Sequence, residues 1–399
     1  HERGQQKAAK FRLVLLFFSQ MRSPRHIVPS LCLAAFGFGS VLSQGGEGEF
    51  DRFGGFRGVA REATGFFRVE EVENRWWFIT PEGYPYIPLG GNHVGNFLKT
   101  QAGESGLLAR HSDDPEAAAE ALLESLRNLG LNAGDAYQPD PRFAERIPWV
   151  KSFHYFPGKN QKWFNVFDPN EVKAVKAHVT SECAGIADNP WILGVAGPDL
   201  PRWDSSYVLP YRIDEPGSFA RTGYEEFLQS RHETIESLNA TNGTQKSDWK
   251  ALATKPRLNF SIEAQAAKEE EEVFLALLAD RHFAIVREAA KAGAPNHLYF
   301  GERTQLRTIP DSVLVAMGRH IEVFCTQSLT RLPKAPPEWQ IFQREHYDHE
   351  FSLVGKPMII VDWAAPFTLA DEPVETEYGT LNPDKDSGVE AAQFVSDAF

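Results

Sequence analysis

Two kinds of periodicity divide the chain. In residues 64–92, TGFFRVEEVENRWWFITPEGYPYIPLGGN, apolar and polar side chains alternate with a period of two until Pro81, Glu82 and Gly83 interrupt the pattern. Such alternation, broken by Pro and Gly, is typical of β-strands joined by turns. It predicts a β-hairpin that leads into a first buried strand over residues 86–89.

Downstream, helical periodicity alternates with short apolar runs. Asp114 can cap a helix over 115–130, and Gly130 can end it. The same pattern predicts helices over 170–186, 224–238 and 266–292, whereas residues 239–265 are polar and irregular. The apolar runs predict buried strands over 131–137, 149–155, 191–196, 297–303, 320–327 and 356–363.

Alternating strands and helices indicate βαβ units and a parallel sheet, so the predicted fold class is α/β. No Gly-x-Gly-x-x-Gly follows the first strand, and we predict a (β/α)8 TIM barrel rather than a dinucleotide-binding fold. Only the amphipathic stretch GVEAAQFVSDAF follows the last strand, so we expect the chain to stop before an eighth strand. The predicted parts are a signal or upstream segment (1–43), a β segment (44–85) and the barrel (86–399).

Composition and charge narrow the function. The 399 residues are 42% hydrophobic and 24% charged, which suits one large globular domain or two smaller ones. The net charge of −13 argues against nucleic acid and anionic membranes, because both require clustered Lys and Arg. The cysteines show no zinc or disulfide spacing, and Cys183 and Cys325 are expected to be buried thiols. No cofactor is predicted.

The N-terminal region has the pattern of an export signal. Met21, Arg22 and Arg25 form a basic start, and the apolar stretch IVPSLCLAAFGFGSVLS follows. This stretch is too short and too interrupted for a transmembrane helix. We expect the mature protein to begin near Gln44 and to be secreted or periplasmic.

Polar side chains follow most of the predicted strands. They are Asn92, His93, Asp135, His154, Asp199, Glu302, Gln327 and Asp362. Because barrels place their chemistry at the carboxyl ends of strands, these residues together predict a site at one rim. Asp199 stands out, because Pro198 and Pro201 make its loop rigid. Each residue taken alone has a capping or loop role as its alternative.

Several segments resemble one family of enzymes. Residues 64–92 are similar to the segment that leads into the catalytic barrel of β-agarases of glycoside hydrolase family 50. Residues 224–253 resemble a region shared with family-42 β-galactosidases. Further similar segments are NVFDPNE (165–171), DNPWILGV (188–195), PNHLYFGER (295–303) and GKPMIIVDW (355–363). The resemblance covers roughly residues 62–399, and it implies a barrel that acts on a galactose-containing polysaccharide.

The resemblance also implies two catalytic Glu residues, and the chain departs from the family at both positions. In that clan the fourth strand ends in Asn-Glu, with the Glu as general acid/base; Asp199 and Leu200 stand there. Asp362 holds the position of the nucleophile. Carboxyl groups about 6.5–9.5 Å apart are typical of inverting glycosidases. Because Asp is roughly 1.5 Å shorter than Glu, our hypothesis is an inverting enzyme with Asp199 as acid and Asp362 as base.

Other candidates have structural alternatives. Glu302 is a second candidate acid or base, with a salt bridge to Arg303 as its alternative. The candidate substrate ligands are Asn92, His93, His154 and Gln327, together with Trp203 and Trp363, which can stack on sugars or pack in the core. The cluster of His346, Asp348 and His349 is more typical of a solvated turn in a loop than of a metal site.

Two functions stay open at this point. One is a glycoside hydrolase that acts on a galactose-containing, agar-like polysaccharide or oligosaccharide through two carboxyl groups. The other is a catalytically inactive barrel that binds carbohydrate, which the loss of both family Glu residues favours. An active enzyme should hold Asp199 or Glu302 opposite Asp362 across an open cleft. In a binding protein the acids should point away or pair with Arg. An oxidoreductase has no cofactor motif in its support.

Overall fold

The structure is a computed structural model of the chain. It describes residues 13–14, 48–91, 111, 114–134, 141–158, 161–199, 201–255, 257–258, 265–327, 337–362, 374–376 and 379–381, and of 13–14, 337–343, 362, 374–376 and 379–381 only the backbone. Within these residues, no helix is both long and apolar enough to cross a membrane. The signal segment predicted over 1–43 falls almost wholly outside them, so export stays a prediction.

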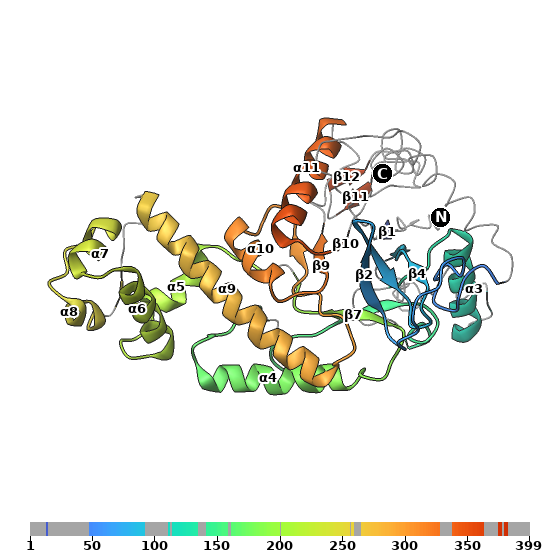
Figure 1. Cartoon of the computed structure of the whole chain (residues 1–399), viewed down its shortest axis with the longest axis horizontal. Helices are drawn as coiled ribbons and strands as arrows, with labels where there is room; N and C mark the ends of the chain where they lie inside the picture. Colours follow the sequence, from blue (N-terminus) through green and yellow to red (C-terminus); the bar gives the residue numbers. More distant parts are fainter. Residues whose placement is uncertain are drawn as a thin grey trace, which may run out of the picture.

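Short parallel strands follow one another in sequence order (Figure 1). Strand β6 (Trp149–Ser152) pairs with β7 (Ile192–Ala196), and β8 (Thr304–Gln305) pairs with β9 (Phe324–Gln327), which pairs with β10 (Met358–Asp362). A parallel bridge between Val195 and Tyr299 joins the two sets of strands. The predicted parallel α/β arrangement is therefore present.

The first parallel strand begins later than the sequence predicts. Strand β4 (Pro85–Tyr86) pairs back onto the hairpin, and the parallel pairing starts only at β5 (Gly90–Gly91), where Gly90 bridges Ala133. Pro88 lacks a backbone N–H and therefore cannot donate to a strand ladder, which explains the delay. The two-residue strand β1 (Leu13–Val14) pairs antiparallel with β5 and also lies against β10.

The predicted hairpin is confirmed. Strands β2 (Arg68–Val72) and β3 (Arg75–Ile79) pair antiparallel. Between them, Glu73 and Asn74 have φ values of 54° and 60°. Positive φ at both central residues defines the type I′ turn, whose twist matches that of the flanking strands.

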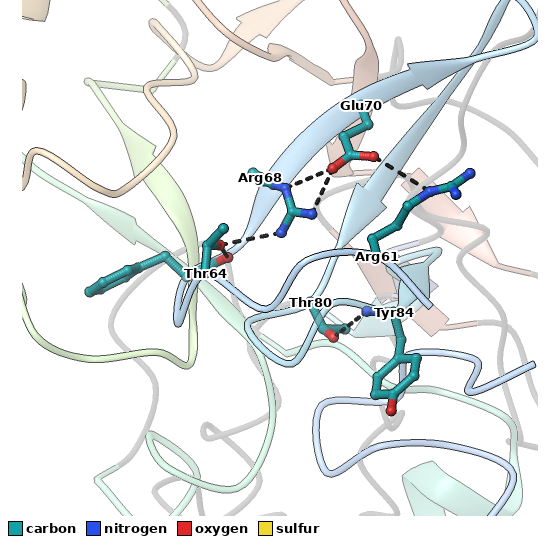
Figure 2. Close-up of polar contacts among 7 residues, drawn as sticks. Arg61, Thr64, Arg68, Glu70, Thr80 and Tyr84 are labelled. Atoms are coloured by element: carbon teal, nitrogen blue, oxygen red, sulfur yellow. Dashed lines mark hydrogen bonds and ion pairs between the residues drawn. The ribbon is translucent and has the colours of Figure 1, made fainter. Parts of the chain in front are cut away.

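Polar contacts tie the hairpin to the chain before it, as Figure 2 shows. Arg68 Nε donates to Glu70 Oε1 at 2.8 Å, and Arg61 Nε lies 3.6 Å from Glu70 Oε2. Arg68 also donates to Thr64 Oγ1 at 3.3 Å. Exposed ion pairs contribute at most about 1 kcal/mol each, so these contacts orient the segment more than they stabilise it.

Three helices form where the sequence predicts them. They are α3 (Pro115–Asn128), α4 (Pro169–Ala184) and α9 (Gln265–Gly293). Asp114 caps α3 as expected, because its carboxylate accepts hydrogen bonds from the N–H groups of Glu116 and Ala117. Helices α4 and α9 pack together closely: a Cβ at Gly293 would lie 2.3 Å from the Thr180 carbonyl oxygen.

The region between β7 and α9 is more helical than predicted. Instead of one helix over 224–238 and an irregular segment, it contains α5 (Ser205–Ile213), α6 (Phe219–Arg231), α7 (Ile235–Asn242) and α8 (Trp249–Ala253). The predicted helix is divided at His232, after which Thr234 caps α7 with its hydroxyl. Helices α6, α7 and α8 lie beside the first turns of α9, away from the strands (Figure 1).

The remaining elements follow β8. Helices α10 (Asp311–Gly318) and α11 (Pro337–Val354) separate the last parallel strands, and β11 (Val374–Thr376) pairs with β12 (Gly379–Leu381). Apolar side chains of the strands divide between two cores. Phe78, Leu193, Phe300, Cys325 and Ile359 belong to an inner cluster, whereas Tyr299, Phe324 and Met358 join the core shared with the helices.

Candidate functional site

Three residues of the predicted site meet at the carboxyl ends of the strands. Asp199 follows β7, and Gln327 ends β9. The Gln327 side-chain amide donates a hydrogen bond to Asp199 Oδ1. In the strand register, Gln327 stands opposite Asp362, the last residue of β10. Asp199 and Asp362 therefore stand at the carboxyl ends of strands that belong to one parallel set, and Gln327 is paired with Asp362 in the backbone register.

The loop around Asp199 prolongs β7 beyond its last regular residue. Gly197 N donates to the Gly301 carbonyl at 2.6 Å, and Arg303 N donates to the Pro198 carbonyl at 3.2 Å. A parallel bridge then joins Asp199 to Arg303. These backbone bonds hold Asp199 in register with the next strand, so its position does not depend on the two prolines alone.

The side chains of Asp199 and Arg303 lie near Cys325, a residue of the inner cluster. Burial raises the pKa of the Cys325 thiol to about 12, while the Arg303 charge lowers that pKa and the Asp199 charge raises it. Both charges are thus close to one buried thiol. Asp199 is half-buried, and Arg303 and Gln327 are buried. This group forms a polar layer above the apolar inner cluster.

Glu302 faces the opposite way from the expected site. Gly301 has a φ of +71°, a left-handed conformation that interrupts the alternation of a strand. Phe300 belongs to the inner cluster, so a regular strand would point Glu302 inward as well. Instead, the Glu302 carboxylate lies against α9, on the helix side of the strand.

The Glu302 carboxylate is fully enclosed. Oε1 accepts a hydrogen bond from the Tyr155 hydroxyl at 2.5 Å and lies 3.2 Å from His282 Nε2, and Oε2 accepts one from Trp203 Nε1 at 2.8 Å. Its exposed fraction is 0%. Burial, and then the Glu302 charge, raise the pKa of Tyr155 well above its usual value. The salt bridge to Arg303 considered as the alternative is replaced by these contacts.

The prediction that Trp203 stacks on a sugar is wrong. Its ring lies between Tyr207, at 4.2 Å between ring centroids and an interplanar angle of 20°, and Phe283, at 5.6 Å and 29°. Only 1% of Trp203 is exposed. Both ring faces are covered, and the core-packing alternative holds.

The other predicted residues fall into two groups. His154 is exposed at the end of β6, while its neighbours Phe153 and Tyr155 are buried. Asn92, His93, Asp135 and Trp363 lie outside the described residues, as does the side chain of Asp362.

The expected solvated turn at 346–349 is also wrong, because these residues belong to helix α11. His349 Nε2 lies 3.0 Å from Asp311 Oδ1. Among the side chains that the structure describes, no group of three His, Cys, Asp or Glu residues is arranged to hold a metal ion.

Two cavities open near the loop that follows Asp199. The larger, of about 470 Å³, lies between the start of α5, helix α9 and residues 307–310, and Trp203 forms part of its wall. The smaller, of about 260 Å³, is lined by Lys162, Trp163, Arg202, Ser206 and Tyr207. Trp163 was not among the residues predicted from the sequence, although an aromatic residue within the polar stretch GKNQKW, just after a strand, indicates a candidate sugar platform.

The chain matches no protein-family model. It is 28% identical over 149 residues to β-agarase B of Vibrio sp. (strain JT0107), a match that covers 34% of this chain and 15% of that protein. In fold it is similar to an agarase (TM-score 0.62, 19% identity, 86% of this chain and 58% of the other). It is equally similar to an exo-β-agarase (TM-score 0.63, 17% identity, 85% and 59%).

The chain has the fold of these agarases. The agarase-like resemblance inferred from its motifs is thereby confirmed at the level of fold and of a shared stretch of sequence. The chain spans 58% and 59% of the length of the two solved agarases.

Proposed function

We propose that this agarase-like chain is a glycoside hydrolase that cleaves a galactose-containing, agar-like polysaccharide or oligosaccharide. One observation carries the proposal: Asp199 and Asp362 end strands of one parallel set, and Gln327 contacts the first by its side chain and faces the second in the strand register. Most glycosidases require two carboxyl groups that flank the glycosidic bond. The named relatives support the substrate class.

Under this proposal the parallel strands belong to a (β/α)8 TIM barrel. Its support is the order of neighbours. Gly90 of β5 bridges Ala133; the next residue, Gly134, bonds to Pro148 just before β6, and β6 pairs with β7. Strand β7 then bridges Tyr299, whose carbonyl accepts from Glu322 N shortly before β9, and β9 pairs with β10. In such barrels the carboxyl ends of the strands carry the catalytic residues. Asp199 and Asp362 occupy those ends, whereas the apolar inner cluster fills the interior below them.

The two carboxyl groups divide the reaction between them. Asp199 protonates the oxygen of the leaving sugar, and Asp362 takes a proton from the water that attacks the anomeric carbon from the other side. The Gln327 amide N–H donates to Oδ1 of Asp199 and helps to hold that carboxylate in position. The shorter side chains of Asp leave space for that water, so the reaction inverts the anomeric configuration.

Glu302 acts as a positioning residue in this scheme. Its carboxylate binds Trp203, which lies four residues beyond Asp199, and Tyr155, which lies after β6. It thereby anchors the loop that carries Asp199 to the neighbouring strands. With an exposed fraction of 0%, it has no surface for a substrate.

The product anomer tests the mechanism. Purified full-length protein is incubated with agarose-derived oligosaccharides, neutral β-galactosides and unrelated β-glucans, and the first product is followed by proton NMR before mutarotation. We expect release from the galactan only, with the inverted anomer appearing first. Retention of the anomeric configuration would contradict the inverting mechanism. Cleavage of glucans alone would contradict the proposed galactan substrate.

The second candidate function is a carbohydrate-binding barrel without catalysis. The observation that favours it is the enclosure of the acids: Glu302 faces α9, and Asp199 is bound by Gln327 beside Arg303. This candidate predicts galactan binding in affinity electrophoresis with no product after long incubation. Detection of a new reducing end that disappears in the Asp199→Asn variant rejects it.

A further inference from the structure

The cavity of about 260 Å³ has the composition of a sugar subsite, and nothing in the proposed mechanism uses it. Trp163 forms one wall and is 36% exposed, although indole rings are usually buried. Its edge packs against Tyr207, at 6.3 Å between centroids and an interplanar angle of 65°. A face of the indole is therefore held in place at an opening, as sugar-stacking platforms require. The volume is below the range of about 300–1,000 Å³ typical of drug-sized ligands and suits one sugar unit.

The polar lining of this cavity is basic. Lys162 and Arg202 both contribute to its wall, and none of its lining residues is acidic. The nearest acid in sequence, Asp204, lines the neighbouring larger cavity, and its carboxylate accepts hydrogen bonds from Ser206 N at 2.8 Å and Ser206 Oγ at 2.5 Å. The chain as a whole has a net charge of −13, yet both charged residues in the lining of this cavity are cations.

Two segments that leave the carboxyl ends of strands line the cavity, and one of them is the segment that follows Asp199. Arg202 is exposed and follows Asp199 by three residues, held between Pro201 and the buried Trp203. Trp163 belongs to the connection between β6 and α4, which also leaves the carboxyl end of a strand. The Gln161 side chain donates to the Trp163 carbonyl at 2.8 Å and stiffens that connection.

We propose that Trp163, Lys162 and Arg202 form a subsite for a sugar unit that carries a negatively charged group, either a sulfate ester or a uronate carboxylate. The inference rests on the proposed function, since it names a subclass of the same saccharide substrate. Trp163 stacks on the ring, and the guanidinium and ammonium groups bind the anionic oxygens. Arg suits this role because its planar fork donates two parallel hydrogen bonds to an oxyanion.

The test compares saccharides of equal length and different charge. Binding of a neutral agarose-derived tetrasaccharide, a sulfated carrageenan-derived tetrasaccharide and a galacturonate tetrasaccharide is measured by calorimetry with full-length protein at low and high salt. We expect an anionic probe to bind about tenfold more tightly than the neutral one at low salt, with the difference reduced at high salt. The stronger of the two anionic probes identifies the group.

Variants separate the subsite from general charge. Combined Lys162→Ala and Arg202→Ala should remove the tenfold preference by lowering the affinity for the anionic probes to that for the neutral one. The control combines Lys173→Ala and Arg231→Ala, which removes the same charge from exposed positions of α4 and α6 and should keep the preference. Trp163→Ala should weaken all three probes.

The outcomes distinguish this inference from the proposed function. Equal affinity for charged and neutral probes, or an unchanged preference in the Lys162/Arg202 variant, overturns the subsite while cleavage of neutral galactan still stands. If the control variant also loses the preference for anionic probes, that preference comes from the overall charge of the protein. This result overturns the subsite too. Absence of both binding and cleavage of every galactan overturns the subsite and the proposed function together.

Discussion

Trp203 Nε1 donates a hydrogen bond of 2.8 Å to Glu302 Oε2. This contact joins the loop that follows Asp199 to the strand end at Glu302. Both residues are almost wholly buried, at 1% and 0% exposure. Both side chains were predicted from the sequence to face the substrate. They are instead bound to each other on the helix side of the strands, beside α9.

Substitution of Glu302 should affect stability more than catalysis. Glu302→Ala leaves Trp203 Nε1 without its buried acceptor and leaves the Tyr155 hydroxyl with His282 Nε2, at 2.8 Å, as its remaining partner. Together with the cavity it creates, this should lower the free energy of unfolding by about 3 kcal/mol. Glu302→Gln should cost about 1 kcal/mol, because the amide oxygen still accepts from Trp203. Urea denaturation at pH 7 measures both. The Gln variant should keep kcat within about tenfold of wild type, whereas a general acid would lose about 100-fold or more.

Gly301→Ala should be strongly destabilising. The residue has a φ of +71°, and an added Cβ would lie 2.8 Å from Ile321 Cγ2, so strain and a clash combine to about 3 kcal/mol. Gly217→Ala is the matched control, because its φ is +83° with nothing within 4 Å of the added Cβ. Its cost should be about 1 kcal/mol, from backbone strain alone. Equal losses of unfolding free energy in the two variants would contradict the packing described around Gly301.

Glu350 should make stability depend on pH in the neutral range. Burial within α11 raises its pKa from 4.5 to about 7, although the Arg307 N–H donates to Oε1 at 2.7 Å. The folded state therefore holds the proton more tightly than the unfolded state. This contribution to stability is complete below about pH 4.5 and declines as the pH rises to about 7.

The measurement compares urea midpoints of wild type and Glu350→Gln between pH 4.5 and 8. Glutamine does not titrate, so the difference between the two proteins should grow with pH in favour of the variant and then level off above about pH 7. Parallel curves across this range would show that Glu350 does not titrate as described.

Much of the fold was predictable from local chemistry. The hairpin followed from alternation, and α3 followed from the Asp114 cap and its apolar stripe. The helices between β7 and α9 were missed because their signals are tertiary. Short helices such as α5 and α8 bury few residues each and depend on packing against their neighbours, which a single periodic pattern does not reveal.

The site was predictable only in part, and Gly301 explains the difference. Asp199 and Gln327 were expected at one rim because each follows or ends a predicted strand, and a hydrogen bond joins them. The same reasoning placed Glu302 at that rim. Gly301, with a φ of +71°, interrupts the strand before it, and the Glu302 carboxylate lies against α9 instead. Glycine adopts positive and negative φ about equally readily, so a glycine in the sequence does not predict which of the two occurs. Trp203 is 1% exposed and Trp163 is 36% exposed, a difference in burial that sequence position alone does not determine.

The central claim is that Asp199 and Asp362 perform the cleavage. The most direct measurement is the initial rate of Asp199→Asn and Asp362→Asn on an agarose-derived oligosaccharide, beside wild type and Glu302→Gln. Asparagine keeps the shape of each side chain and removes its acid–base chemistry, so both variants should fall by about 1,000-fold, with Glu302→Gln close to wild type. Undiminished turnover in the two Asn variants, or no turnover in wild type, would contradict the account.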